Sequence, residues 1–317
     1  MQQEILIAVD NSDHSVEAID YLLSIDSMIR KPNYTIAHIH PAISAFIMEE
    51  AEHDPAAKRK LSELLQRNHD NASSLLQRFA SKMREAGIEE KRLKTVSRPQ
   101  LSGIAKDILD FALVGRYDAL VVGRRGISKA QEMFMGSVTA QLLEHSQVTP
   151  VWVVDRKPEL SKMVIAVDGS ESALRAVDHV AFMLRGNQAQ SVTLLHVKPK
   201  IGNYLAIDFH LPDTEADSEP NPELDDLVRQ TDGRRLKHFF KAAVAKFREA
   251  GIHRDQLHIM EVDCTMNVGK TITKEMAQGR FGTVVIGRSG ENRSFFFGSV
   301  SKCVLENYTE GAVWLVP

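Results

Sequence analysis

Residues 119–139, ALVVGRRGISKAQEMFMGSVT, carry the strongest structural signal in the chain. The first four residues are apolar and rich in β-branched side chains, so they predict a buried strand that ends at Gly123, with Gly126 three residues later. Gly136 and Ser137 precede a segment whose leucines have helical spacing, and Ser137 is predicted to be the N-cap of that helix. Glycines let the backbone approach a phosphate closely, and a helix start favours an anion. The stretch therefore predicts a phosphate-binding loop.

The first half of the chain alternates short apolar strands with amphipathic helices. The strands are predicted at Glu4–Asp10, Tyr34–His40, Lys91–Ser97, Ala119–Gly123 and Pro150–Asp155. The helices before the glycine loop are predicted at about residues 11–25, 58–86 and 102–114. This alternation predicts an α/β fold, with a mostly parallel sheet and helices on both faces.

The same order recurs in the second half, which indicates two copies of one fold. MVIAVDGSESALRAVDHV repeats ILIAVDNSDHSVEAIDYL and places Asp168 opposite Asp10. RFGTVVIGRSG likewise repeats RYDALVVGRRG at the predicted fourth strand. We therefore expect a first domain over residues 1–156 and a second over residues 161–317.

Length, charge and cysteine content exclude several classes of protein. A chain of 317 residues with 43% hydrophobic and 26% charged residues is typical of two globular domains. A net charge of -3 gives no sign of nucleic-acid or anionic membrane binding, and two cysteines are too few for a disulfide framework. No apolar run has membrane-spanning length, and because the first residues lead directly into a predicted strand we expect no signal peptide. We expect a cytoplasmic protein that binds neither nucleic acid nor membrane.

On these residues the chain resembles the universal stress protein family in its tandem, two-domain form. Gly123, Gly126, Gly136 and Ser137 match the family pattern G-x2-G-x9-G-[ST] at full spacing, and Asp10 lies in the expected AVD context. The resemblance implies two Rossmann-like (adenine nucleotide alpha hydrolase-like) domains, each with a five-stranded, mostly parallel sheet. It also implies a stress-response sensor or regulator that binds ATP, with or without Mg²⁺.

The resemblance also assigns roles to residues of the first domain. Ala8 and Val9 would flank the adenine, the backbone of Ile39 would pair with its edge, and Asp10 would meet the ribose or a divalent cation. The expected phosphate ligands are Gly123, Arg124, Gly126, Gly136, Ser137, Val138 and Thr139. From the residues alone, Arg124 and Arg125 are either phosphate ligands or solvated side chains.

The second domain has matching positions but a shorter loop. These positions are Asp168, Val197, Gly287, Gly290, Gly298, Ser299, Val300 and Ser301. Seven residues, including Phe295–Phe297, separate its last two loop glycines, whereas nine separate those of the first domain. Nucleotide binding is therefore expected mainly in the first domain, and binding in the second stays open.

No residue pattern predicts efficient catalysis or a metal site. NVGKT at residues 267–271 lacks the glycine of a P-loop, because Cys264 stands in its place. His38 and His40 share a strand face, but no third ligand is set by spacing. We expect ATP occupancy to act as a signal to an unknown protein partner. A slow ATPase or autophosphorylating enzyme, and an interaction scaffold with empty sites, remain alternatives.

The last strand of each half suggests how the halves associate. Val151–Val154 and Ala312–Val316 are apolar on both faces and would be adhesive at a sheet edge. In the family such strands pair two domains. We therefore expect an internal pseudo-dimer of the two halves, and further self-association into a homodimer is compatible with the sequence.

Overall fold

The computed structural model describes residues 2–125, 135–156, 162–187, 189–198, 222–265, 267–289 and 298–317, without the side chains of 222–229. Two predicted ligand residues, Gly126 and Gly290, lie outside the described residues. The chain divides into two compact units. The first comprises Met1–Pro158 and Thr309–Leu315, and the second comprises Glu159–Tyr308 and Val316–Pro317.

The first unit is built on a parallel sheet whose strands lie in the order β3-β2-β1-β4-β5. These strands are β1 (Glu4–Ala8), β2 (Asn33–His40), β3 (Leu93–Pro99), β4 (Ala119–Gly123) and β5 (Val151–Val154). Every residue of β4 and β5 is buried, as their apolar sequences predict. Strand β10 (Ala312–Val316) pairs with β5 in the antiparallel direction, and Trp314 stacks on Trp152 with ring centroids 3.7 Å apart.

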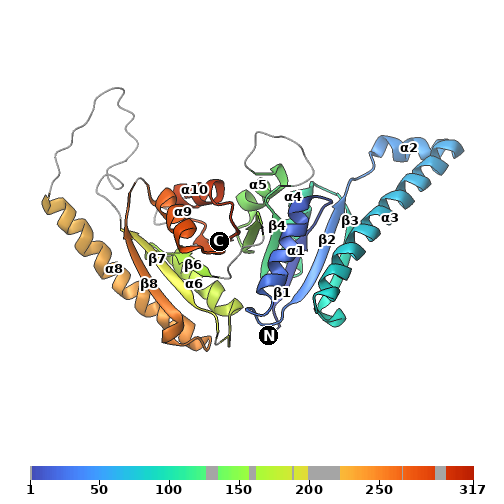
Figure 1. Cartoon of the computed structure of the whole chain (residues 1–317). Coiled ribbons are helices and arrows are strands. Elements are labelled where there is room, and N and C mark those ends of the chain that lie inside the picture. The colour runs from blue at the N-terminus through green and yellow to red at the C-terminus, as the bar shows by residue number, and fades with distance from the viewer. Residues whose placement is uncertain are drawn as a thin grey trace, which may run out of the picture. The chain divides into compact units, whose positions relative to one another are not determined.

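Helices cover both faces of this first sheet (Figure 1). They are α1 (Asp13–Ile25), α3 (Pro55–Glu85), α4 (Ile104–Val114) and α5 (Ser137–His145). Helix α2 (Ala45–His53) packs on α3, and a 3₁₀ turn lies at Glu90–Arg92. Helix α1 packs against α3, and α4 packs against α5. Helix α3 begins three residues before its predicted start, because the Asp54 side chain caps it and Pro55 suits the first helical position.

The second unit repeats this arrangement with the parallel order β9-β6-β7-β8. Its strands are β6 (Met163–Ala166), β7 (Val192–Lys198), β8 (Leu257–Asp263) and β9 (Thr283–Gly287). Its helices are α6 (Glu171–Met183), α8 (Pro222–Glu249), α9 (Val268–Gly279) and α10 (Ser299–Asn307), with a 3₁₀ turn at Arg254–Gln256. Helix α6 packs against α8, and α9 packs against α10. The predicted α/β fold with mostly parallel strands is confirmed.

One ion pair occurs at the same place in both units. In the first unit, Lys82 Nζ on α3 lies 2.7 Å from Asp20 Oδ1 on α1. In the second, Lys246 Nζ on α8 lies 2.7 Å from Asp178 Oδ1 on α6. Since each pair joins corresponding helices, α3 packs on α1 in the same register as α8 packs on α6. Within the described residues, no helix combines the length and apolarity needed to cross a membrane.

Candidate functional site

The predicted site residues that the structure describes in the first unit come from three strand ends and one helix start. They are Ala8, Val9, Asp10, Ile39, Gly123, Arg124, Gly136, Ser137, Val138 and Thr139. Strands β1, β2 and β4 are parallel neighbours, so their carboxyl ends meet at one edge of the sheet. In open parallel sheets this edge is where ligands bind.

Asp10 follows β1, and its carboxylate holds the turn into α1. Its Oδ1 atom accepts hydrogen bonds from the Ser12 backbone N–H at 3.1 Å and from the Ser15 hydroxyl at 2.8 Å. The Ser12 hydroxyl bonds to the same oxygen and also caps α1 through the Ser15 backbone N–H. The turn therefore orients the Asp10 carboxylate at the edge of the sheet before any ligand arrives.

The ends of β1 and β2 are joined by a histidine. The Val9 N–H donates to the Ala37 carbonyl at 2.9 Å, and the Val9 carbonyl lies 2.8 Å from Nδ1 of His38. Because a carbonyl oxygen can only accept, His38 Nδ1 is the donor. Val9 and Ile39 are buried, while Ala8 is half-buried. His38 therefore holds together the two strand ends to which the adenine was assigned.

Gly123 ends β4 where the first turn of α1 comes close. A Cβ atom at this position would lie 2.7 Å from both the Cβ and the backbone oxygen of His14. The backbone of Gly123 is not in the left-handed region, so close packing rather than positive φ requires glycine. The Thr139 hydroxyl donates to the Gly123 carbonyl at 2.9 Å. Its proton is therefore already bonded within the chain and is not available to a phosphate.

Arg124 is a buried part of the sheet edge. Its side chain is 1% exposed, and its guanidinium Nε lies 3.4 Å from Asp155 Oδ1. Burial lowers the pKa of Arg124, and the Asp155 carboxylate partly opposes that effect. The Arg124 backbone donates to the Val154 carbonyl at 2.7 Å and accepts from the Gly136 N–H at 3.0 Å. A solvated Arg124 is therefore ruled out, whereas the neighbouring Arg125 is exposed.

The amino end of α5 has no side-chain cap, as is also true of α4 and α10 among the described helices. The N-cap is Gly136, at φ −65° and ψ 147°, and Ser137 is the first helical residue, so the prediction of Ser137 as the N-cap is wrong. Since Gly136 has no side chain, no side-chain cap bonds to the first N–H groups of α5. Side chains do cap α1, α2, α3, α6 and α9, through Ser12, Ser44, Asp54, Ser170 and Asn267. The start of α5 can therefore receive an external acceptor.

The second unit reproduces this frame. Gly298 is the N-cap of α10, again without a side-chain cap, and Ser299 and Val300 begin the helix. The Ser301 hydroxyl donates to the Gly287 carbonyl at 2.8 Å, as Thr139 does to Gly123. A Cβ on Gly287 would meet Ser172 on the first turn of α6, at 2.8 Å from its carbonyl carbon.

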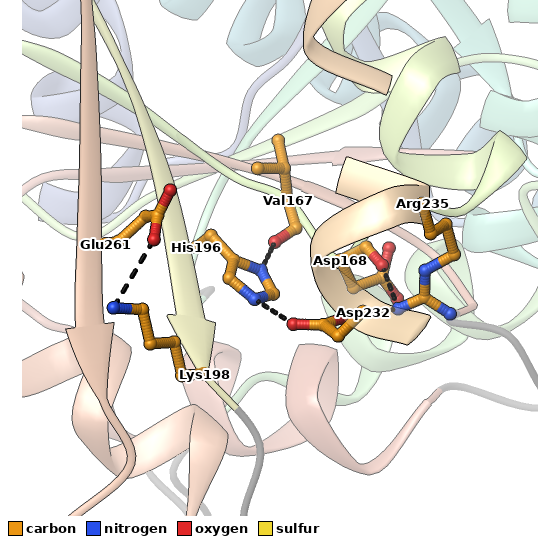
Figure 2. Close-up of polar contacts among 7 residues, drawn as sticks. All are labelled: Val167, Asp168, His196, Lys198, Asp232, Arg235 and Glu261. Atoms are coloured by element: carbon orange, nitrogen blue, oxygen red, sulfur yellow. Dashed lines mark hydrogen bonds and ion pairs between the residues drawn. The ribbon is translucent and has the colours of Figure 1, made fainter. Parts of the chain in front are cut away.

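At the strand ends of the second unit, Asp168 and Val197 lie beside charged side chains that sequence reasoning missed. The Asp168 carboxylate accepts from the Ser170 N–H at 3.0 Å, and Val197 is 6% exposed. Figure 2 shows Asp232 and Arg235 of α8 reaching His196 and Asp168. Asp232 and Arg235 are three residues apart, which predicts only that they share one face of a helix. The sequence therefore gave no indication that this face contacts His196 and Asp168.

The NVGKT segment forms an ordinary capped helix start. Asn267 is the N-cap of α9, and its side chain accepts from the Lys270 N–H at 2.8 Å. The first N–H groups of α9 are thus partly satisfied within the chain.

The sequence and the structure were both found to be similar to known proteins. The model of the Universal stress protein family matches residues 1–155 and 159–317. A universal stress protein from Archaeoglobus fulgidus shares the fold, with 17% identity, a TM-score of 0.59 and coverage of 99% of this chain and 97% of that chain. A functionally unknown protein from Pseudomonas aeruginosa has 12% identity, a TM-score of 0.57 and coverage of 99% and 92%.

A shorter similar structure contains a nucleotide. It is a universal stress protein family protein from Arabidopsis thaliana with AMP bound, 20% identical, with a TM-score of 0.33 and coverage of 48% of this chain and 90% of that chain. None of the curated proteins compared with the chain matches it.

Proposed function

The chain belongs to the universal stress protein family and contains two tandem Usp domains. We propose that it is a cytoplasmic stress-response regulator whose first domain binds ATP. The nucleotide lies at the edge formed by the ends of β1, β2 and β4. The proposed domain limits are residues 1–156 and 161–317.

The observation that carries this proposal is the start of α5. Its N-cap is a glycine, its first turn contains no acidic residue, and Gly136 is held beside Arg124 at the end of β4. Backbone N–H groups and the helix dipole at such a start favour a phosphate. Gly136, Ser137 and Val138 are the proposed donors, and Gly123 and Thr139 position them.

The base and ribose are assigned to the strand ends. Val9, the residue after β1, and Ile39 near the end of β2 are both buried, and their backbone groups suit an adenine. The oriented carboxylate of Asp10 suits a ribose hydroxyl or a Mg²⁺ ion on the triphosphate. Several charge-assisted hydrogen bonds at ~1.5–3 kcal/mol each support a dissociation constant on the order of micromolar, once ordering costs are included.

We propose that occupancy, rather than turnover, is the output. The Asp10 carboxylate is engaged by Ser12 and Ser15, and the Arg124 guanidinium lies against Asp155, which does not suit an efficient general base or a mobile phosphate clamp. A slow ATPase or autophosphorylating enzyme is the alternative. A steady-state phosphate-release assay with Ser137→Ala as control separates them, since a signalling site shows binding with negligible release.

Location and assembly complete the proposal. Cys264 and Cys303 are both thiols, which supports a reducing compartment such as the cytoplasm. We also propose an internal pseudo-dimer of the two halves, because residues from the end of the second half, Ala312–Leu315, pair with β5 inside the first unit. Light scattering on the purified chain tests whether whole chains also form a homodimer.

The test is calorimetric titration of magnesium-ATP into nucleotide-stripped protein, compared with Gly136→Asp. The Gly136 backbone suits any residue, and aspartate is a favoured N-cap, so this variant keeps α5 folded while its carboxylate takes the N–H groups and repels phosphate. The matched control is Asn267→Asp, which adds the same charge at the start of α9.

We expect wild type and Asn267→Asp to bind ATP equally, and Gly136→Asp to bind at least about tenfold more weakly with unchanged thermal stability. If Gly136→Asp binds as well as wild type, the phosphate is not at α5. If wild type gives no heat, the interaction-scaffold alternative replaces nucleotide binding.

A further inference from the structure

In the second unit, the buried Asp232 links the buried His196 to Arg235, and the described residues of the first unit contain no matching contacts. Figure 2 shows Asp232 of α8 between the His196 ring and the Arg235 guanidinium. Asp232 Oδ2 lies 2.9 Å from His196 Nε2, and Asp232 Oδ1 lies 3.2 Å from Arg235 Nη2. The same guanidinium nitrogen donates to the Asp168 carbonyl. Side chains of α8 are therefore bonded to the ends of both β6 and β7.

The two nitrogens of the His196 ring both face acceptors. Nδ1 lies 2.9 Å from the Val167 carbonyl, which can only accept, and Nε2 faces the Asp232 carboxylate. The His196 ring is therefore held between a backbone carbonyl and a carboxylate. Lys198 on β7 and Glu261 on β8, which Figure 2 shows nearby, pair with each other at 3.4 Å.

The corresponding positions of the first unit are uncharged. Asp232 and Arg235 lie 17 and 14 residues before Glu249, the last residue of α8, and Asn68 and Asn71 lie equally far before Glu85, the last residue of α3. The ion pairs at Lys82 and Lys246 show that these helices share one register.

His38 and His196, at corresponding positions of the two units, differ in how far they are buried. His38 corresponds to His196, and within residues 2–125 no hydrogen bond or ion pair joins His38 to α3. His38 is half-buried, whereas His196 is only 2% exposed. Among the described residues, His38 is thus not bonded to the long helix of its unit, as His196 is.

Besides the positions of Asp232 and Arg235, the position of Gly169 also differs between the two units. Gly169 has φ +80°, and a Cβ atom there would lie 2.8 Å from Arg235 Nε, so glycine makes room for the arginine side chain. The corresponding residue of the first unit is Asn11, which is exposed. Three linked differences therefore separate the units: Asn11 against Gly169, Asn68 against Asp232, and Asn71 against Arg235.

We propose that Asp232 and Arg235 form an internal closure over the strand ends of the second unit, so that the chain holds nucleotide in the first unit only. Arg235 bonds to the carbonyl of Asp168, and Asp232 bonds to His196, the neighbour of Val197. Asp168 and Val197 correspond to Asp10 and Ile39, the proposed ribose and adenine contacts of the first unit. Exclusion of nucleotide rests on the proposed function, whereas the covering of His196 does not.

The binding test uses a variant that gives the second unit the residue types of the first: Gly169→Asn, Asp232→Asn and Arg235→Asn together. In calorimetry with magnesium-ATP, the wild type is expected to bind one nucleotide per chain, and the triple variant two, with the affinity of the first site unchanged. A stoichiometry of two in the wild type, or of one in the folded triple variant, would overturn the exclusion.

A second measurement does not depend on nucleotide. Diethyl pyrocarbonate modifies neutral, accessible histidine rings, and mass spectrometry locates the product. We expect His196 in the wild type to react at least about tenfold more slowly than His38, and at a similar rate to His38 in Asp232→Asn. Equal rates in the wild type, or equal protection of His196 in both proteins, would overturn the closure. If labelling behaves as expected while wild type binds no ATP, the closure stands and the proposed function fails.

Discussion

The Arg124 guanidinium and the Asp155 carboxylate form a buried ion pair, with Nε and Oδ1 3.4 Å apart and side chains 1% and 14% exposed. The pair joins the residue after β4 to the residue after β5. Its position next to Gly136 N–H, which bonds to the Arg124 carbonyl, makes it part of the support for the start of α5.

We predict that Asp155→Asn destabilises the protein by about 2–4 kcal/mol, because it removes the carboxylate that compensates a buried guanidinium. The measurement is urea unfolding at pH 7. The control is Arg84→Gln, which breaks the pair with Glu90 whose side chains are 42% and 72% exposed, and should cost under ~1 kcal/mol. Equal effects of the two variants would show that Arg124 is not held by Asp155.

Gly123 yields a second prediction. Alanine there would place a Cβ 2.7 Å from the backbone oxygen of His14, so Gly123→Ala should destabilise the protein by about 1–3 kcal/mol. The matched control is Gly233→Ala on α8, where a Cβ meets nothing within 4 Å and alanine should stabilise the helix by about 0.5–1 kcal/mol. Thermal unfolding of both variants tests these opposite signs. A Gly123→Ala protein as stable as wild type would contradict the close packing of β4 on α1.

His179 on α6 predicts a dependence of stability on pH. Burial lowers the pKa of His179 from 6.5 to about 4, with the Asp178 carboxylate opposing the shift. Between these values the unfolded chain binds more protons than the folded chain, so this group's contribution to stability is lost as pH falls from 6.5 towards 4. We expect a loss of about 1–3 kcal/mol from this one group.

The measurement is urea unfolding of wild type and His179→Gln at pH 7, 6 and 5. The variant cannot take up this proton, so its stability should fall less over that range, and the difference between the proteins isolates the histidine from the titrating carboxylates. Parallel pH profiles would show that His179 is not kept neutral by the fold.

Local sequence determined where the elements of the sheet lie. The run ALVVG predicted β4 at Ala119–Gly123, and the strand has those bounds, because apolar β-branched residues favour a buried strand and glycine ends it. The repeat of AVD and of the glycine loop likewise predicted two copies of one α/β fold. Helix α2 was not predicted, since its short segment depends on packing against α3.

Tertiary structure alone decided what the site residues contact. His14 makes position 123 require glycine, Asp155 takes the Arg124 guanidinium, and α8 brings Asp232 to His196 from 36 residues away. Such contacts depend on which helix faces cover the sheet, and helical periodicity shows that a face is buried without showing which side chains it meets. The sequence thus predicted matching strand-end sites in the two halves, and packing decided that Asp232 and Arg235 of α8 bond to His196 and to the Asp168 carbonyl in the second unit.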